Sequence, residues 1–173
     1  KRKTRYTWEM IKLNGAWAGI NTNIPNVLAY EAVRDGEIPQ LSGYARVRRE
    51  VTYADSRIDV YAENDHEQCF IEVKNVTMKG GRYALFPDAV TKRGSKHLAT
   101  LMRIREAGMR AVMLYVVQRR DVEIFAPATA IDPDYARGLA GAVKAGVEVI
   151  PVHAYVSPEE IRINQTMPWV LER

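Results

Sequence analysis

A run of seven apolar residues, from Ala111 to Val117, constrains the fold of this chain more than any other feature. Successive side chains of a strand point to opposite faces of a sheet, so a strand that is apolar at every position has no face for water. Such a strand belongs in the middle of a sheet that other elements cover on both faces. The run therefore predicts an α/β domain.

The rest of the chain supplies elements that can surround this strand. Alternating or continuous apolar stretches predict strands, and apolar residues at helical spacing predict helices. The expected strands cover 6–11, 15–20, 44–51, 57–62, 69–76, 122–125 and 147–155, and the expected helices cover 25–35, 88–108 and 132–145. Asp88 is the expected N-cap of the second helix, and 79–82 is expected to be a loop. The resulting order is α-β-β-β-α-β with a mixed sheet, followed by a further α-β at the C-terminus.

Length and composition exclude several classes of protein. The length of 173 residues predicts one main domain. No apolar run approaches the ~20 residues that a membrane-spanning helix needs. Cys69 is the only cysteine, which excludes a disulfide framework, and the three histidines lack zinc-ligand spacing. No apolar signal segment follows the N-terminus, so we expect a cytoplasmic protein without membrane contact.

The charge is unevenly distributed along the chain. The net charge is +4, and residues 79–110 carry eight Lys or Arg against two acids. Residues 55–72, in contrast, carry six acids and one basic residue. Solvated faces explain such runs, and so does a carboxylate pocket for a cation beside a surface for a polyanion.

Three residues on the acidic strands carry the chemistry we consider. Glu72 and Lys74 are two apart in a strand and therefore share a face, and Asp59 can come alongside if 57–62 and 69–76 pair as a hairpin. Two neighbouring carboxylates repel each other unless a hard cation such as Mg²⁺ or Mn²⁺ lies between them. A lysine beside the metal can orient or activate a water, which suffices for phosphodiester hydrolysis.

This spacing is weak evidence by itself, since an exposed strand with alternating charge looks the same. The apolar neighbours of the acids and the basic helix that follows favour the metal site. Glu31 adds a carboxylate on the border of the first helix, although an ion pair with Arg34 explains it equally well.

Taken together, these residues and the elements that carry them resemble a known family. The element order with Glu31, Asp59 and Glu72-x-Lys74 is similar to the core of the PD-(D/E)XK nucleases, a restriction-endonuclease-like fold. The stretches 56–59, 71–77 and above all Phe86-Pro87-Asp88-Ala89-Val90-Thr91-Lys92-Arg93-Gly94-Ser95-Lys96-His97-Leu98 resemble the sugar fermentation stimulation protein A family. The resemblance implies that Asp59 and Glu72 bind Mg²⁺ or Mn²⁺, that Lys74 assists catalysis and that Glu31 supports the metal.

The same resemblance implies DNA as the partner and a particular domain organisation. Members of the family begin with a small OB-like barrel, so we expect 1–20 to be remnant strands of such a module or a linker from it. Residues 21–173 are then the nuclease-like domain. A two-fold homodimer is the oligomer to expect on general grounds.

Basic residues that could contact DNA phosphates lie on an expected strand, a loop and the N-terminal part of a helix. A helix N-terminus favours phosphate, and basic side chains there oppose the macrodipole. The candidates are Arg46, Arg48, Lys79, Arg82, Lys92, Arg93 and Lys96. The sequence favours a boundary position for His97 over a ligand role. Two other functions stay open: a DNA-binding regulator that keeps the nuclease fold without turnover, and an interaction domain whose basic bias is incidental.

Overall fold

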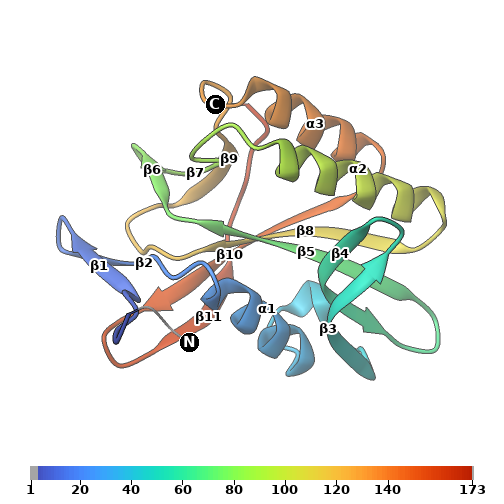
Figure 1. Ribbon diagram of the computed structural model, residues 1–173, viewed down its shortest axis with the longest axis horizontal. Helices are drawn as coiled ribbons and strands as arrows, with labels where there is room; N and C mark the ends of the chain where they lie inside the picture. The colour runs from blue at the N-terminus through green and yellow to red at the C-terminus, as the bar shows by residue number, and fades with distance from the viewer. Residues whose placement is uncertain (1–3, 173) are drawn as a thin grey trace.

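A central six-stranded sheet organises the chain in a computed structural model that describes residues 4–172 (Figure 1). Its strand order is β11-β10-β8-β5-β4-β3. The bounds are β3 Arg46–Tyr53, β4 Ser56–Glu63, β5 Gln68–Val76, β8 Arg110–Val117, β10 Glu148–Val156 and β11 Ile161–Thr166. Strand β8 runs parallel to both β5 and β10, whereas the other pairs are antiparallel. The predicted mixed sheet is confirmed, and residues 111–117 of its central strand β8 are all buried.

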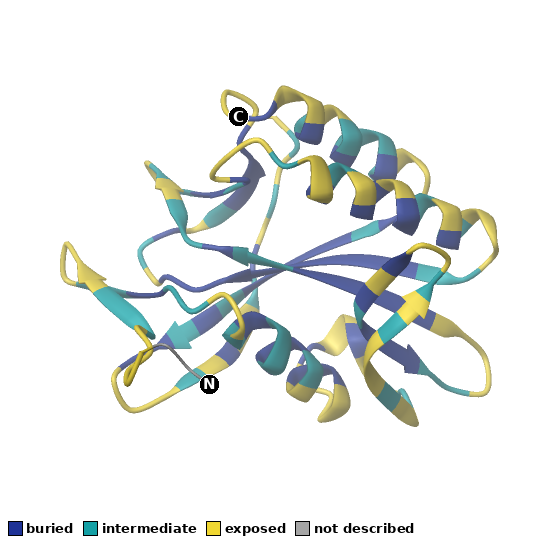
Figure 2. Ribbon diagram, in the orientation of Figure 1, coloured by how far each residue is buried: buried dark blue, intermediate teal, exposed yellow. Residues whose placement is uncertain are grey.

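Three α-helices cover the two faces of this sheet. Helix α1 (Ile24–Arg34) lies on one face, and α2 (Lys92–Glu106) and α3 (Pro133–Lys144) lie together on the other (Figure 1). Each face of the sheet has its own cluster of buried apolar side chains. The strands are mostly buried, and the helices are exposed on the sides that point away from the sheet (Figure 2). A short 3₁₀ helix, Pro39–Leu41, follows α1. None of the helices within residues 4–172 is long and apolar enough to cross a membrane.

Two smaller sheets lie beside the central one. The first pairs β1 (Met10–Leu13) with β2 (Ala16–Gly19), and the second has the order β6-β7-β9. Its strands are β6 Met78–Gly80, β7 Tyr83–Phe86 and β9 Ile124–Pro127. The prediction of a loop over 79–82 is therefore wrong at its start, because a three-residue strand is too short to give a periodic signal.

The N-cap of α2 is Thr91 rather than the predicted Asp88. The Thr91 hydroxyl accepts a hydrogen bond from the Gly94 amide at 2.9 Å, whereas Asp88 is exposed in the preceding loop. Both residue types cap helices well, so local sequence alone could not decide between them. Val90 is 71% exposed, which shows that the apolar face of the helix begins later than its spacing indicated.

Asp132 joins the N-terminal ends of α2 and α3. Its side chain is buried, and its two oxygens accept hydrogen bonds from the amides of Tyr135 (2.9 Å) and Thr91 (2.8 Å). These two backbone donors, first Thr91 and then Tyr135, hold the pKa of Asp132 below its ordinary value. One carboxylate therefore caps one helix and fixes the entry into the other.

We expect Asp132→Ala to lower the free energy of unfolding by about 2 kcal/mol at pH 7, because two buried amides lose their acceptor. Asp134→Ala, on the exposed side of the same helix, should change it by less than about 0.5 kcal/mol. Urea unfolding measures both values, and equal effects of the two substitutions would contradict the capping role.

The pH dependence of this contribution has a defined sign. A carboxylate whose folded pKa is depressed stabilises the fold above its unfolded pKa and loses that effect as pH falls through the folded value. The stability gap between wild type and Asp132→Ala should therefore be constant near neutral pH and narrow as the pH falls below 3.8, the ordinary pKa of an aspartate side chain. Urea unfolding of both proteins between pH 7 and pH 3 measures this gap.

Candidate metal and nucleic-acid site

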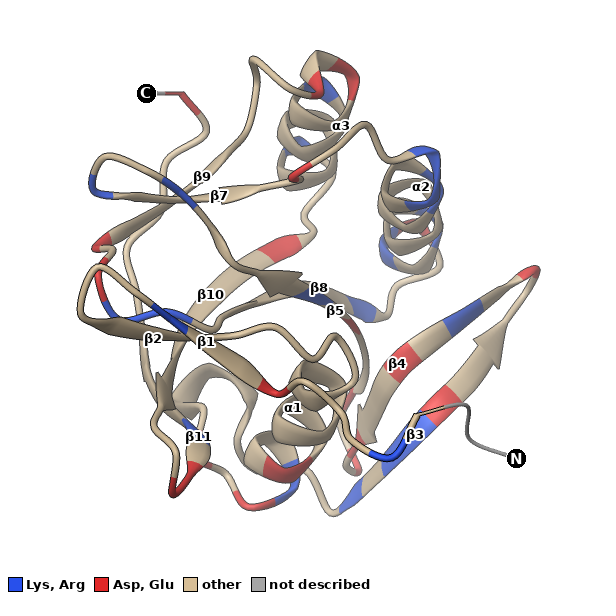
Figure 3. Ribbon diagram, turned by 60° about the vertical axis from the view of Figure 1, so that its left-hand side comes forward, with Lys and Arg blue, Asp and Glu red and all other residues tan. Residues whose placement is uncertain are grey.

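The site lies where strands β4 and β5 separate. Their ladder runs from Glu63 opposite Gln68 to Val60 opposite Ile71 and has no further registered pair in the described chain. Beyond it, β3 and β4 diverge from the rest of the sheet (Figure 3). Asp59 is the first residue of β4 past the ladder, and its Oδ2 accepts a hydrogen bond from the Val73 amide at 2.8 Å. The carboxylate thus takes the place of the missing strand partner.

Glu72 and Lys74 follow on β5 and point toward α2. Lys74 Nζ lies 2.6 Å from Glu72 Oε1, as the alternation of a strand predicts for residues two apart. The Glu72 side chain is 1% exposed and that of Lys74 is 13% exposed. The structure therefore brings Glu72 and Lys74 together in a nearly dry environment next to Asp59.

The two carboxylates differ in their electrostatics. Burial, followed by the negative charge of Glu72, raises the pKa of Asp59 above its ordinary value. Burial also acts to raise the pKa of Glu72, but the hydrogen bond from His97 and the charge of Lys74 outweigh it, and the pKa lies below the ordinary value. Glu72 is therefore held as an anion, and Asp59 lies within range of its charge.

One oxygen of Glu72 is left without a partner. Oε1 contacts both Lys74 and His97, whereas Oε2 is buried and has no hydrogen-bond partner among the described residues. A buried anionic oxygen without a partner costs free energy, so its position needs an explanation. A divalent cation between this oxygen and Asp59 would supply the missing interaction.

The donor set suits a cation that keeps much of its water. Within residues 4–172 there is no group of three or more His, Cys, Asp or Glu side chains that could hold a metal ion. Two carboxylates are nevertheless enough for Mg²⁺, which commonly binds through one or two carboxylates and retains several waters. Oxygen ligands alone also argue against zinc or copper.

Helix α1 contributes Asn26 to this site rather than the predicted Glu31. Asn26 Nδ2 donates to Asp59 Oδ1 at 2.8 Å. Glu31 lies five residues further on, which rotates it by about 140° around the helix axis, and it is exposed. The periodicity of α1 predicted its buried face, but the rotation that selects one polar residue over another depends on how the helix docks.

His97 is the second site residue that sequence reasoning did not assign. It is 7% exposed, and its Nδ1 contacts Glu72 Oε1. Its Nε2 lies 3.4 Å from Arg93 Nε. The available signal was a polar residue on the buried face of an amphipathic helix, beside Leu98 and one turn before Leu101.

Lys and Arg residues are frequent along α2 and β3 (Figure 3). Five of the seven predicted phosphate contacts have acidic partners. Arg46 and Arg48 lie beside Glu63, Lys79 beside Asp121, Arg82 beside Glu123 and Lys96 beside Asp55. Of the remaining two, Arg93 contacts His97, and Lys92 is exposed without an ion pair among the described residues. Exposed pairs are worth about 0–1 kcal/mol, so they can open to a phosphate.

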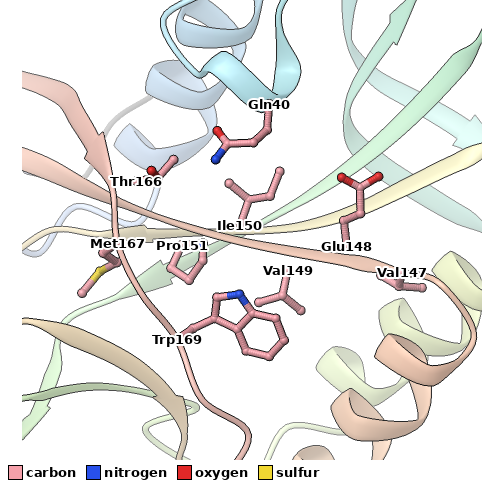
Figure 4. A pocket seen from close by; sticks show the side chains of 9 residues that line it. All are labelled: Gln40, Val147, Glu148, Val149, Ile150, Pro151, Thr166, Met167 and Trp169. Atoms are coloured by element: carbon pink, nitrogen blue, oxygen red, sulfur yellow. The ribbon is translucent and has the colours of Figure 1, made fainter.

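A hollow elsewhere on the molecule is separate from this chemistry. It has a volume of about 370 Å³ and lies along the part of β10 that β11 does not cover, between Glu148 and Trp169 (Figure 4). Its lining in the described chain includes none of the predicted site residues.

The chain is similar in sequence and in structure to known proteins. A family model, the sugar fermentation stimulation protein RE domain, matches residues 23–160. Sugar fermentation stimulation protein homologs from Geobacter metallireducens and Pelobacter propionicus are 51% and 50% identical over 172 and 166 residues, which is 98% and 95% of this chain and 74% and 72% of theirs. The structure of Pyrococcus furiosus SfsA in complex with Ca²⁺ superposes with a TM-score of 0.91 at 27% identity, covering 98% of this chain and 74% of that one.

Proposed function

This chain belongs to the sugar fermentation stimulation protein family, and from that premise we propose that it is a divalent-metal-dependent phosphodiesterase that acts on DNA. The observation that carries the proposal is the buried, unpartnered Oε2 of Glu72, whose carboxylate acts through its charge on Asp59, with the amine of Lys74 at 2.6 Å from the other oxygen of the same carboxylate. The fold supports it as well, because α1, β3, β4, β5, α2 and β8 follow in the order expected of a nuclease-like core.

Asp59 and Glu72 are the residues that would hold Mg²⁺ or Mn²⁺. Each Asp59 oxygen accepts one hydrogen bond, so each keeps a lone pair for a cation. When bound, such an ion lowers the pKa of a coordinated water and neutralises charge on a phosphate oxygen. The Pyrococcus furiosus relative was solved in complex with Ca²⁺, a cation that prefers oxygen ligands, and this supports a divalent-cation site here.

Lys74 would act on the reacting groups rather than on the metal. Its ammonium has three donors, and the contact with Glu72 uses one of them. The other donors can orient the attacking water or bind a non-bridging phosphate oxygen, where negative charge grows in the transition state. Because the amine is nearly buried, this interaction is stronger than it would be in water.

The N-terminal turn of α2 would bind the DNA backbone. Arg93 reaches His97, which itself contacts Glu72, so this turn lies beside the carboxylates. Exposed Lys92 extends the positive surface outward, and the amides of a helix N-terminus add to the attraction for phosphate.

Incubation of the chain with single- and double-stranded DNA tests the proposed activity. We expect cleavage with Mg²⁺ or Mn²⁺ and none with EDTA. Readdition of Mg²⁺ to the EDTA-treated sample should restore cleavage. Equal background cleavage under all conditions would contradict the catalytic proposal.

A second candidate function has its own supporting observation. Lys74, His97, Asn26 and Val73 already donate to three of the four carboxylate oxygens, so the site is held together without a metal. A site that is held together without a metal favours a DNA-binding protein that keeps the nuclease-like fold but does not cleave DNA. DNA binding that is unaffected by EDTA, together with no cleavage, would identify that function.

We expect Lys92→Ala to weaken DNA binding about equally for all sequences, because the residue would contact phosphate and not bases. The slope of log K against log salt should become shallower by about 1. Lys144→Ala, which removes an exposed lysine from α3, is the matched control. Fluorescence anisotropy over a salt series measures both slopes, and identical slopes would argue against a phosphate contact at Lys92.

A further inference from the structure

His97 occupies an unusual position for a polar side chain. It is one of the buried residues of α2, as are Leu98 and Leu101, and it is 7% exposed. Its two ring nitrogens contact different groups: Nδ1 faces Glu72 Oε1, and Nε2 faces Arg93 Nε at 3.4 Å. The ring therefore connects the deepest carboxylate of the site to a basic residue on the exposed side of the helix.

The hydrogen-bond partners of this ring indicate which of its nitrogens donates to Glu72. An ionised Glu72 can only accept, so the proton must be on Nδ1. An arginine can only donate, so Nε2 must offer its lone pair. Lys74 Nζ lies 3.1 Å from Nδ1, and because both are donors they converge on the same Glu72 oxygen instead of bonding to each other.

Two donors on one oxygen set the orientation of the whole carboxylate. A single flexible donor such as Lys74 would let the Glu72 carboxylate rotate and exchange its oxygens, whereas the buried ring of His97 on α2 holds Oε1, and with it Oε2, in one place. That second oxygen is the buried atom without a partner among the described residues.

Resting on the proposed metal site, we propose that His97 is a positioning residue: it holds Glu72 Oε1 so that Oε2 is presented to the divalent cation. Residues that hydrogen-bond a metal ligand fix its orientation, and their loss typically lowers metal affinity by about 10–100-fold. His97 would neither bind the metal nor touch DNA. Its effect on activity would come through the affinity for the cation.

Two substitutions separate this role from simple packing. In His97→Asn, the amide nitrogen takes the place of Nδ1 and can still donate to Glu72, but no atom replaces Nε2. In His97→Leu, the apolar volume is kept and the donor is lost. Isothermal titration with Mn²⁺, at neutral pH and without DNA, measures the affinity of each protein, and thermal unfolding without metal reports whether each variant folds.

We expect His97→Leu to bind Mn²⁺ about 10–100-fold more weakly than wild type and His97→Asn to stay within about 3-fold. If His97→Leu folds and binds Mn²⁺ like wild type, or if His97→Asn is as weak as His97→Leu, the positioning role is overturned while the metal site stands. If the wild type itself binds no Mn²⁺, the proposed function fails and the role of His97 fails with it.

Discussion

Replacing Asp59 with asparagine should abolish metal-dependent DNA cleavage, by at least about 10³-fold, and should make the metal-free protein more stable. Cleavage is lost because a metal ligand is lost, and stability is gained because a charge buried beside Glu72, where the pKa of Asp59 is raised, is removed. A neutral amide removes that repulsion. It can still accept from the Val73 amide, and Asn26 can turn its own amide to present an oxygen. We expect a gain of roughly 1 kcal/mol in the free energy of unfolding at pH 7.

The cation should reverse this order of stability. With Mg²⁺ at 100 times its dissociation constant, wild type gains about 2.7 kcal/mol, and the variant should gain almost nothing. Thermal unfolding with EDTA and with Mg²⁺ measures both shifts, and a cleavage assay is run on the same samples. Asp55→Asn is the control, because Asp55 is an exposed acid in the turn between β3 and β4, paired with Lys96 and Arg103. Full cleavage by Asp59→Asn, or equal Mg²⁺ shifts in variant and wild type, would contradict the assignment.

Replacing Lys74 with methionine should impair DNA cleavage but leave metal binding intact. The apolar stem is kept, but the donor for the water or phosphate is lost, so cleavage should fall by about 10²–10⁴-fold. Affinity for Mn²⁺ should be unchanged or tighter, because a competing cation has left Glu72 while His97 still holds Oε1.

Single-turnover cleavage and isothermal titration measure these two quantities on one preparation. Lys144→Met, at an exposed position of α3, controls for the loss of a positive charge. Cleavage within 2-fold of wild type would exclude a catalytic role for Lys74. Loss of metal binding would instead make Lys74 a structural support of Glu72.

Local sequence predicted the elements whose burial is unambiguous. The apolar run 111–117 marked the central strand, and the turn signal after Glu63 marked the antiparallel pair β4 and β5. Strand β11 was not predicted, because it is an edge strand that buries only Ile163.

The site was predictable only as far as it lies within one strand. Glu72 and Lys74 share a face by alternation, and no docking information is needed to see it. Asn26 and His97 reach the carboxylates from helices on opposite faces of the sheet, and their rotation about the helix axis depends on side-chain packing across the whole core. That packing also decides why Asn26, and not Glu31, meets Asp59.

Diffraction from a crystal soaked in Mn²⁺ tests the metal site most directly. We expect an anomalous peak between Asp59 and Glu72, within bonding distance of Glu72 Oε2. Strong peaks at other acids with none at this position, and Oε2 still without a ligand, would contradict it.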